Sequence, residues 1–142
     1  MKEQQTNGKV IIVDYINKYN YKEYIGKTVK VTENVRLSDL GLTKIPINFT
    51  EVGGSFYCYN NQLTSLEGAP SEVGFDFDCG YNYLTSLEGS PKEVGGYFSC
   101  EYNELTSLVG APTKVGDDFY CSDNPLKSFE GKPKFIGGYF IK

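Results

Sequence analysis

A segment of 21 residues repeats without gaps along most of this 142-residue chain, and the repeat constrains the fold more than any other feature. Counted from a valine, the unit reads V-G-x-x-F-x-C-x-x-N-x-L-T-S-L-x-G-x-P-x-x, and full copies begin at Val52, Val73, Val94 and Val115. A degenerate copy precedes them, and "IGGYFIK" at the end supplies seven positions of another. One such unit cannot bury its apolar side alone, so we expect the units to stack around a continuous core.

The fifth to seventh positions of the unit predict a strand. Phe and Cys alternate there with variable residues. In an extended chain, residues two apart point to the same side, so the Phe and Cys side chains share one side. The leucines at positions twelve and fifteen are expected to face inward from the following turn, while glycine and proline return the chain irregularly. We therefore predict a repeat solenoid that is mainly β, with one short parallel strand per 21-residue unit.

The residues before the repeats are predicted to close one end of the core. We expect an N-terminal cap over residues 1–30 and the solenoid over residues 31–142, as one degenerate unit, four full units and a terminal strand. Apolar residues in segment 9–24 recur at helical spacing and predict a helical cap, although the β-branched run there favours a strand. These apolar residues are Ile12, Tyr15, Ile16 and Tyr19. The alternative is a docking helix that presents Lys18 and Lys22.

Each full unit contains one cysteine at its seventh position, and these four residues are expected to form a column of free thiols in the core. Cysteine is among the most buried residue types and acts there as a small hydrophobe. Parallel strands about 4.8 Å apart leave a disulfide open as an alternative, but their Cβ atoms point the same way, which suits a bridge poorly. A zinc site needs ligands that converge on one point, which a column does not provide. The residues are Cys58, Cys79, Cys100 and Cys121.

The residue inventory disfavours catalysis. The chain contains no histidine, so a Cys–His or Ser–His pair cannot form. The Gly-Gly pairs recur with the period of the unit and therefore indicate turns rather than a phosphate-binding loop. Paired acids, such as Asp76 with Asp78 or Asp117 with Asp118, more often form solvated surface than an acid–base couple or a calcium site. We expect no enzymatic activity, no cofactor and no metal.

The unit resembles the leucine-rich repeat family, whose core pattern is matched here by Phe56-x-Cys58-x-x-Asn61-x-Leu63 and its three successors. The 21-residue length of the unit and its "LTSLEGAP…VGG" sequence are similar to repeat arrays in short bacterial and phage proteins. The resemblance covers residues 31–142 and implies a leucine-rich-repeat-like fold in which the asparagines form a ladder that bonds loop backbone. The need for such a ladder is also physical, because buried backbone groups require partners. The phage resemblance further implies a host protein, such as a defence component, as the partner.

The thirteenth and fourteenth positions of most units hold Thr and Ser. Rows of exposed threonine bind ice on other solenoids, which gives one interpretation. In tight turns, however, these hydroxyls bond loop backbone, and this is the role we expect.

The variable positions four, six and eight are expected to face outward and to form a protein-binding site. β-favouring tyrosine can simply fill exposed strand positions, but here it is combined with Asp and Glu on one face. Tyrosine offers rigid contact area with a polar tip, and the acids select a basic partner. The predicted binding residues are Tyr57, Tyr59, Asp76, Asp78, Tyr97, Glu101, Asp118 and Tyr120.

Charge narrows the partner classes. Residues 1–30 carry six lysines and three acids, whereas residues 31–142 carry eight basic and fifteen acidic residues. An acidic repeat region disfavours direct binding of nucleic acid and favours a protein with a basic surface. The alternatives are an acidic mimic of nucleic acid that inhibits a nucleic-acid-binding protein, and a structural solenoid that self-associates through its exposed C-terminal strand.

The sequence lacks an apolar run of export-signal or membrane-spanning length. The longest candidate, "VIIV", is bracketed by Lys9 and Asp14. We therefore expect no membrane association and a cytoplasmic location, which is the host cytoplasm if the chain is phage-encoded.

Overall fold

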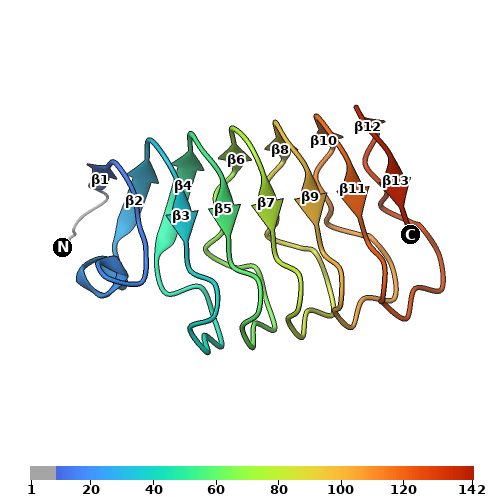
Figure 1. Cartoon of the computed structure of the whole chain (residues 1–142), viewed down its shortest axis with the longest axis horizontal. Coiled ribbons are helices and arrows are strands. Elements are labelled where there is room, and N and C mark those ends of the chain that lie inside the picture. Colours follow the sequence, from blue (N-terminus) through green and yellow to red (C-terminus); the bar gives the residue numbers. More distant parts are fainter. Residues whose placement is uncertain (1–8) are drawn as a thin grey trace.

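The computed structural model describes residues 9–142, which form a parallel-strand β-solenoid of about six turns. The turns stack along the long axis of the molecule, with the first strands at one end and the last strands at the other (Figure 1). Every strand pairs in parallel with its equivalent in the next turn, and Phe56 lies opposite Phe77, which lies opposite Phe98. The repeat solenoid expected from the sequence is confirmed.

The described residues form two sheets. The valine sheet has the strand order β1 (Val10–Val13), β2 (Thr28–Val31), β4 (Asn48–Val52), β6 (Glu72–Val73), β8 (Glu93–Val94), β10 (Lys114–Val115) and β12 (Phe135–Ile136). The phenylalanine sheet has the strand order β13 (Phe140–Ile141), β11 (Phe119–Tyr120), β9 (Phe98–Ser99), β7 (Phe77–Asp78), β5 (Phe56–Tyr57) and β3 (Val35–Arg36).

The expectation of one strand per unit is wrong, because each unit contributes one strand to each sheet. The Glu-Val dipeptide before the glycine at position two is extended and pairs with its copies, as Glu72 does with Glu93. The glycine that follows does not interrupt the sheet but makes the corner between the two strands. A Cβ atom at Gly74 would collide with the carbonyl oxygen of Gly53 in the preceding turn, so only glycine fits this corner.

Columns of identical residues fill the core. The Val, Phe, Cys and both Leu columns of the full units are buried, except in the last unit, where Leu126 is half-buried and Phe129 replaces the second Leu and is exposed. The phenylalanine rings stack along the axis, with centroid distances of 5.2 Å from Phe56 to Phe77, 5.3 Å from Phe77 to Phe98 and 5.2 Å from Phe98 to Phe119. Stacked aromatic pairs add about 0.5–1.5 kcal/mol each beyond their buried area, so the column ties each turn to the next.

The asparagines form the expected ladder. Asn82 accepts a bond from the Leu63 amide at 2.9 Å and donates bonds to the carbonyl oxygens of Cys58 and Cys79, each at 3.1 Å. One side chain therefore satisfies backbone groups of two successive turns. The same pattern recurs at Asn61, Asn103 and Asn124.

The position-fourteen serines also act as expected. Ser65 accepts a bond from the amide of Glu67, and Ser86 accepts one from the amide of Glu88, each at 3.0 Å. The hydroxyl thus closes the turn that precedes the return segment.

The helix expected over segment 9–24 is wrong. Residues Val10–Val13 form β1, which extends the valine sheet beyond β2, and the only helical turn of the described chain is the short 3-10 helix η1 (Tyr21–Tyr24). The β-branched run Val-Ile-Ile-Val decides the local structure in favour of a strand. Ile16 is fully buried and bridges to Val35, so the segment packs against the first turn of the core. Residues 1–8 of the expected cap lie outside the described residues. None of the described helical residues forms a segment long and apolar enough to cross a membrane.

Candidate functional site

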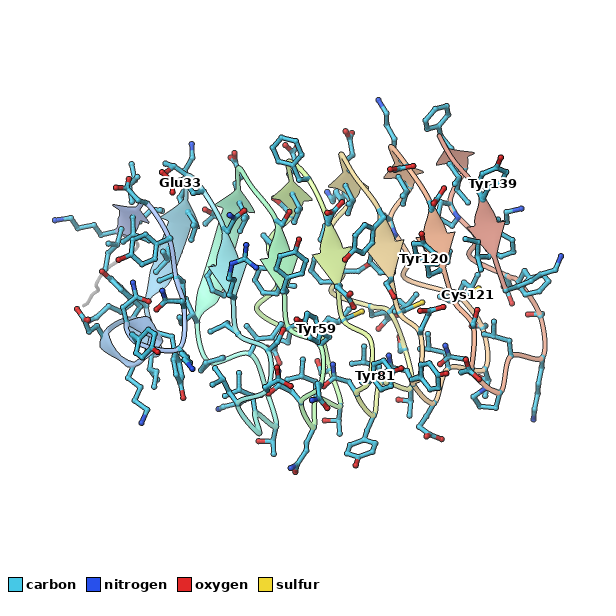
Figure 2. All side chains as sticks on the ribbon, viewed as in Figure 1. Glu33, Tyr59, Tyr81, Tyr120, Cys121 and Tyr139 are labelled. Atoms are coloured by element: carbon cyan, nitrogen blue, oxygen red, sulfur yellow. The ribbon has the colours of Figure 1, made fainter. Side chains whose placement is uncertain are left out.

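The outer side of the phenylalanine sheet carries the predicted binding residues. Their positions alternate with the buried Phe and Cys, so all eight are half-buried or exposed, and Tyr59 is the most open at 37 %. In Figure 2, Tyr120 lies at the level of the strands, with Tyr59 closer to the turns. We call this set the strand face; it consists of Tyr57, Tyr59, Asp76, Asp78, Tyr97, Glu101, Asp118 and Tyr120.

A carboxylate with unfavourable surroundings lies near the centre of the strand face. Burial raises the pKa of Asp78, and the negative charges of Glu101 and Asp76 raise it further, although bonds from the Gly80 amide and the Tyr97 hydroxyl oppose this. Tyr97 donates its hydroxyl hydrogen to Asp78 Oδ2 at 3.3 Å. Because the described side chains that act on Asp78 include acids but no cation, a positively charged group from a partner would relieve the repulsion.

Tyrosine pairs lie on both sides of this carboxylate. Tyr97 and Tyr120 contact each other edge to face with a centroid distance of 5.8 Å, and Tyr57 and Tyr59 do so at 6.1 Å. The guanidinium of Arg36, from the adjacent turn, lies 5.1 Å from the centroid of the Tyr57 ring. The chain's own arginine thus shows how a guanidinium stacks on this face.

Two of the predicted binding residues also have a structural role that the sequence reasoning missed. Asp76 Oδ1 accepts a bond from the Tyr97 amide at 2.9 Å, and Asp118 Oδ1 accepts one from the Tyr139 amide at 2.7 Å. The carboxylate occupies space beside position three of the next unit, where a Cβ atom at Gly96 would collide with Asp76. The sequence signal for this contact is an Asp or Asn at position four of one unit combined with a glycine at position three of the next unit.

A second aromatic cluster lies at the turn that follows the strands, next to the strand face. The rings of Tyr81 and Tyr102 stack with a centroid distance of 4.3 Å and an interplanar angle of 13°. Figure 2 shows Tyr81 below the strands, at the level of the turns. These residues border an open hollow of about 340 Å³. We call this cluster the turn edge; it consists of Asn60, Tyr81, Tyr83, Tyr102, Glu104 and Asp123.

The backbone of the stacked tyrosines is strained. Tyr81 and Tyr102 have φ angles of 55° and 57°, in the left-handed region. The neighbouring units have Asn60 and Asp123 at this position, which are residue types that tolerate this region. The left-handed conformation costs most other residues about 1–2 kcal/mol. The site predicted from the sequence does not include these tyrosines, because side-chain spacing does not reveal the sign of φ.

The strand face and the turn edge share one electrostatic character. Positions four to eleven of the four full units contain no Lys or Arg, and the acids there include Asp78, Glu101, Glu104 and Asp123. The lysines of these units lie at other positions, as Lys92 and Lys114 do at or before the valine sheet. The lysines of the full units therefore lie away from the strand face and the turn edge.

The cysteines form the expected buried column of free thiols. Burial raises the pKa of Cys58, Cys79 and Cys100 far above the usual range, and raises that of Cys121, in the last full unit, to about 11. A thiol that stays protonated is a poor nucleophile and a poor metal ligand. Among residues 9–142 no group of three or more His, Cys, Asp or Glu side chains is arranged to hold a metal ion.

Comparison with protein families, with curated proteins and with solved structures finds no match to this chain. The interpretation of the site therefore depends on the chemistry of its surface.

Proposed function

We propose that this chain is a non-enzymatic protein-interaction module that binds a basic partner protein through its strand face. The observation that carries the proposal is the combination of tyrosines and carboxylates on the outer side of the phenylalanine sheet, where positions four to eleven of the four full units contain no Lys or Arg. Interfaces favour tyrosine because the ring gives a large contact area at a small cost in side-chain entropy.

The scaffold suits such a role. Backbone bonds between successive turns and the asparagine ladder hold the strand face in one geometry, so little order is lost on binding. Tyr57, Tyr97 and Tyr120 would supply the contact energy, whereas Asp78 and Glu101 would steer a basic partner and set the salt dependence of association.

The more specific expectations belong to the same proposal. The asparagine ladder and the L-T-S-L turn support a leucine-rich-repeat-like assignment. Because similar arrays occur in phage proteins, we extend the proposal to a host protein, such as a defence component, as the partner in the host cytoplasm. A nucleic-acid mimic is less well supported, since Asp76 and Asp118 use carboxylate oxygens to bond backbone rather than to imitate phosphates.

Affinity capture tests the proposal. The tagged chain is used to isolate partners from cells, next to a Tyr57→Ala/Tyr97→Ala/Tyr120→Ala variant and a matched Phe135→Ala control, whose exposed ring lies on the valine sheet. We expect the triple variant to keep its melting temperature and lose the captured protein, with each tyrosine contributing about 2 kcal/mol. A captured protein that the triple variant binds as well as wild type does would place the site elsewhere.

A further inference from the structure

We propose that the stacked pair Tyr81 and Tyr102 at the turn edge binds an arginine side chain of the basic partner. This inference rests on the proposed function, because it takes a basic protein as the partner, but it assigns a different set of residues and a specific chemical group. Tyr102 directly follows Glu101 of the strand face, so one extended segment of the partner could contact both sets of residues.

The backbone strain indicates that the fold does not select these tyrosines. Position nine is left-handed in five successive turns, and the other three occupants are Asp39, Asn60 and Asp123, which accommodate this conformation. Tyrosine at two neighbouring units is thus the exception. Strain that persists at adjacent surface positions is a feature of ligand sites, where the side chain is retained for contact.

The exposure of the rings agrees with this interpretation. Tyr81 and Tyr102 remain 54 % and 45 % exposed although they stack on each other, and Tyr83 beside them is 56 % exposed. About half of each ring therefore remains accessible to a partner. They do offer an aromatic platform at the border of a hollow that also contains Asn60 and Glu104.

The charges around the platform select a cation, and its shape selects a planar one. The Asp123 carboxylate raises the pKa of the Tyr102 hydroxyl, which shows how close this negative charge lies to the platform. Guanidinium is planar, stacks on aromatic rings and donates paired bonds to carboxylates, whereas a lysine ammonium is a strongly hydrated point charge. The contact between Arg36 and Tyr57 provides the same pairing within this chain.

The test uses the whole chain and a defined probe, a capped nine-residue peptide that alternates glycine and arginine. Its lysine twin is the charge control, and a neutral linear hexasaccharide tests whether the rings bind sugar instead. Binding is measured by isothermal titration calorimetry for wild type, for Tyr81→Asn/Tyr102→Asn and for Tyr57→Ala/Tyr97→Ala/Tyr120→Ala. Asparagine is chosen because Asn60 occupies the same position in the preceding unit.

We expect wild type to bind the arginine peptide at least tenfold more tightly than the lysine peptide. We also expect Tyr81→Asn/Tyr102→Asn to lose at least tenfold in affinity for the arginine peptide while its melting temperature stays equal or rises. Equal affinity for the two peptides, tighter binding of the hexasaccharide, or a lower melting temperature of this variant would each overturn the inference.

The two variants separate the two proposals. If only the strand-face variant loses affinity for the arginine peptide, the turn-edge inference fails while the proposed function stands. If only the turn-edge variant loses affinity, the turn edge is the site and the strand-face proposal fails. If neither variant loses affinity, both proposals fail.

Discussion

At the scale of single residues, the side chains that repeat most strictly serve the backbone or the core rather than the surface. Asn82 is the clearest case, because its amide bonds backbone groups of two turns and only 4 % of it is exposed. Polar character alone therefore does not mark a binding residue in this chain.

Replacing Asn82 by Leu should destabilise the fold strongly. The change leaves the Leu63 amide and the Cys58 and Cys79 carbonyl oxygens without their partner, and each unsatisfied buried group costs about 1–3 kcal/mol. We expect the urea midpoint of the variant to be clearly lower and its free energy of unfolding to fall by about 3 kcal/mol or more. Asn48→Leu, at an exposed position, is the control and should change the midpoint little. Equal midpoints for the two variants would show that the ladder is not needed.

The buried thiols should make the fold sensitive to alkali. In the unfolded chain each thiol ionises near 9.0, whereas burial keeps Cys79 protonated in the folded chain at much higher pH. Above pH 9 the unfolded state therefore loses protons first, and the folded state loses relative stability as pH rises further. We expect the melting temperature of wild type to fall as pH rises above 9. In Cys79→Ala the melting temperature should depend less on pH. The same slope in both proteins would exclude the thiol as its source.

At the scale of elements, the glycine corner between the two strands of a unit determines the register of the sheets. The position-two glycines stack so closely that the carbonyl of one turn occupies the space of a Cβ in the next. The amide of Gly74 also donates to the Val52 carbonyl at 2.9 Å, which fixes the height of the corner.

Gly74→Ala should therefore cost far more than Gly80→Ala. At Gly74 the new Cβ meets the backbone of Gly53, which cannot move without disturbing the next corner. At Gly80 the nearest atom is Asp78 Oδ1 at 3.1 Å, which belongs to a side chain. We expect Gly74→Ala to lose about 3 kcal/mol of unfolding free energy, whereas Gly80→Ala loses less than about 1 kcal/mol. Denaturant titration of both proteins decides, and equal losses would contradict the role of the corner.

What could be predicted from the sequence follows from this regularity. The 21-residue period fixes the phase of the Phe, Cys, Leu and Asn columns, so their burial could be inferred without the structure. The valine-sheet strand of each unit could not be predicted, because a Glu-Val dipeptide followed by glycine is too short to show the alternation of a strand. The cap was misjudged because the helical spacing of Ile12 and Ile16 competes with β-branching, and the sign of φ at Tyr81 is hidden from any side-chain pattern.

At the scale of the whole molecule, the placement of the lysines outside positions four to eleven of the full units predicts how binding responds to salt. Asp78 and Glu101 lie within positions four to eleven of the full units, which contain no Lys or Arg, whereas Glu72 and Glu93 lie in a row on the valine sheet. If a cation approaches the phenylalanine sheet, removing carboxylates there should slow association, and removing those on the valine sheet should not.

We expect Asp78→Asn/Glu101→Gln to associate several-fold more slowly with the arginine peptide at low salt, and the difference from wild type to shrink as salt is raised. Glu72→Gln/Glu93→Gln, with the same change in net charge, should associate at nearly the wild-type rate. Stopped-flow measurement of the association rate over a range of salt gives the comparison. Equal slowing in both variants would indicate a response to net charge alone.

The contact between position four of one unit and position three of the next has a consequence for how such a chain can grow. Position three of the next unit is Gly96 after Asp76 and Gly138 after Asp118. After Tyr97, which needs no such glycine, this position is Asp117. This contact therefore repeats every two units, although the core repeats every unit. Duplication of a pair of units preserves every match, whereas loss of the unit that begins at Val94 would set Asp117 against Asp76. A solenoid of this kind should thus gain or lose units in pairs.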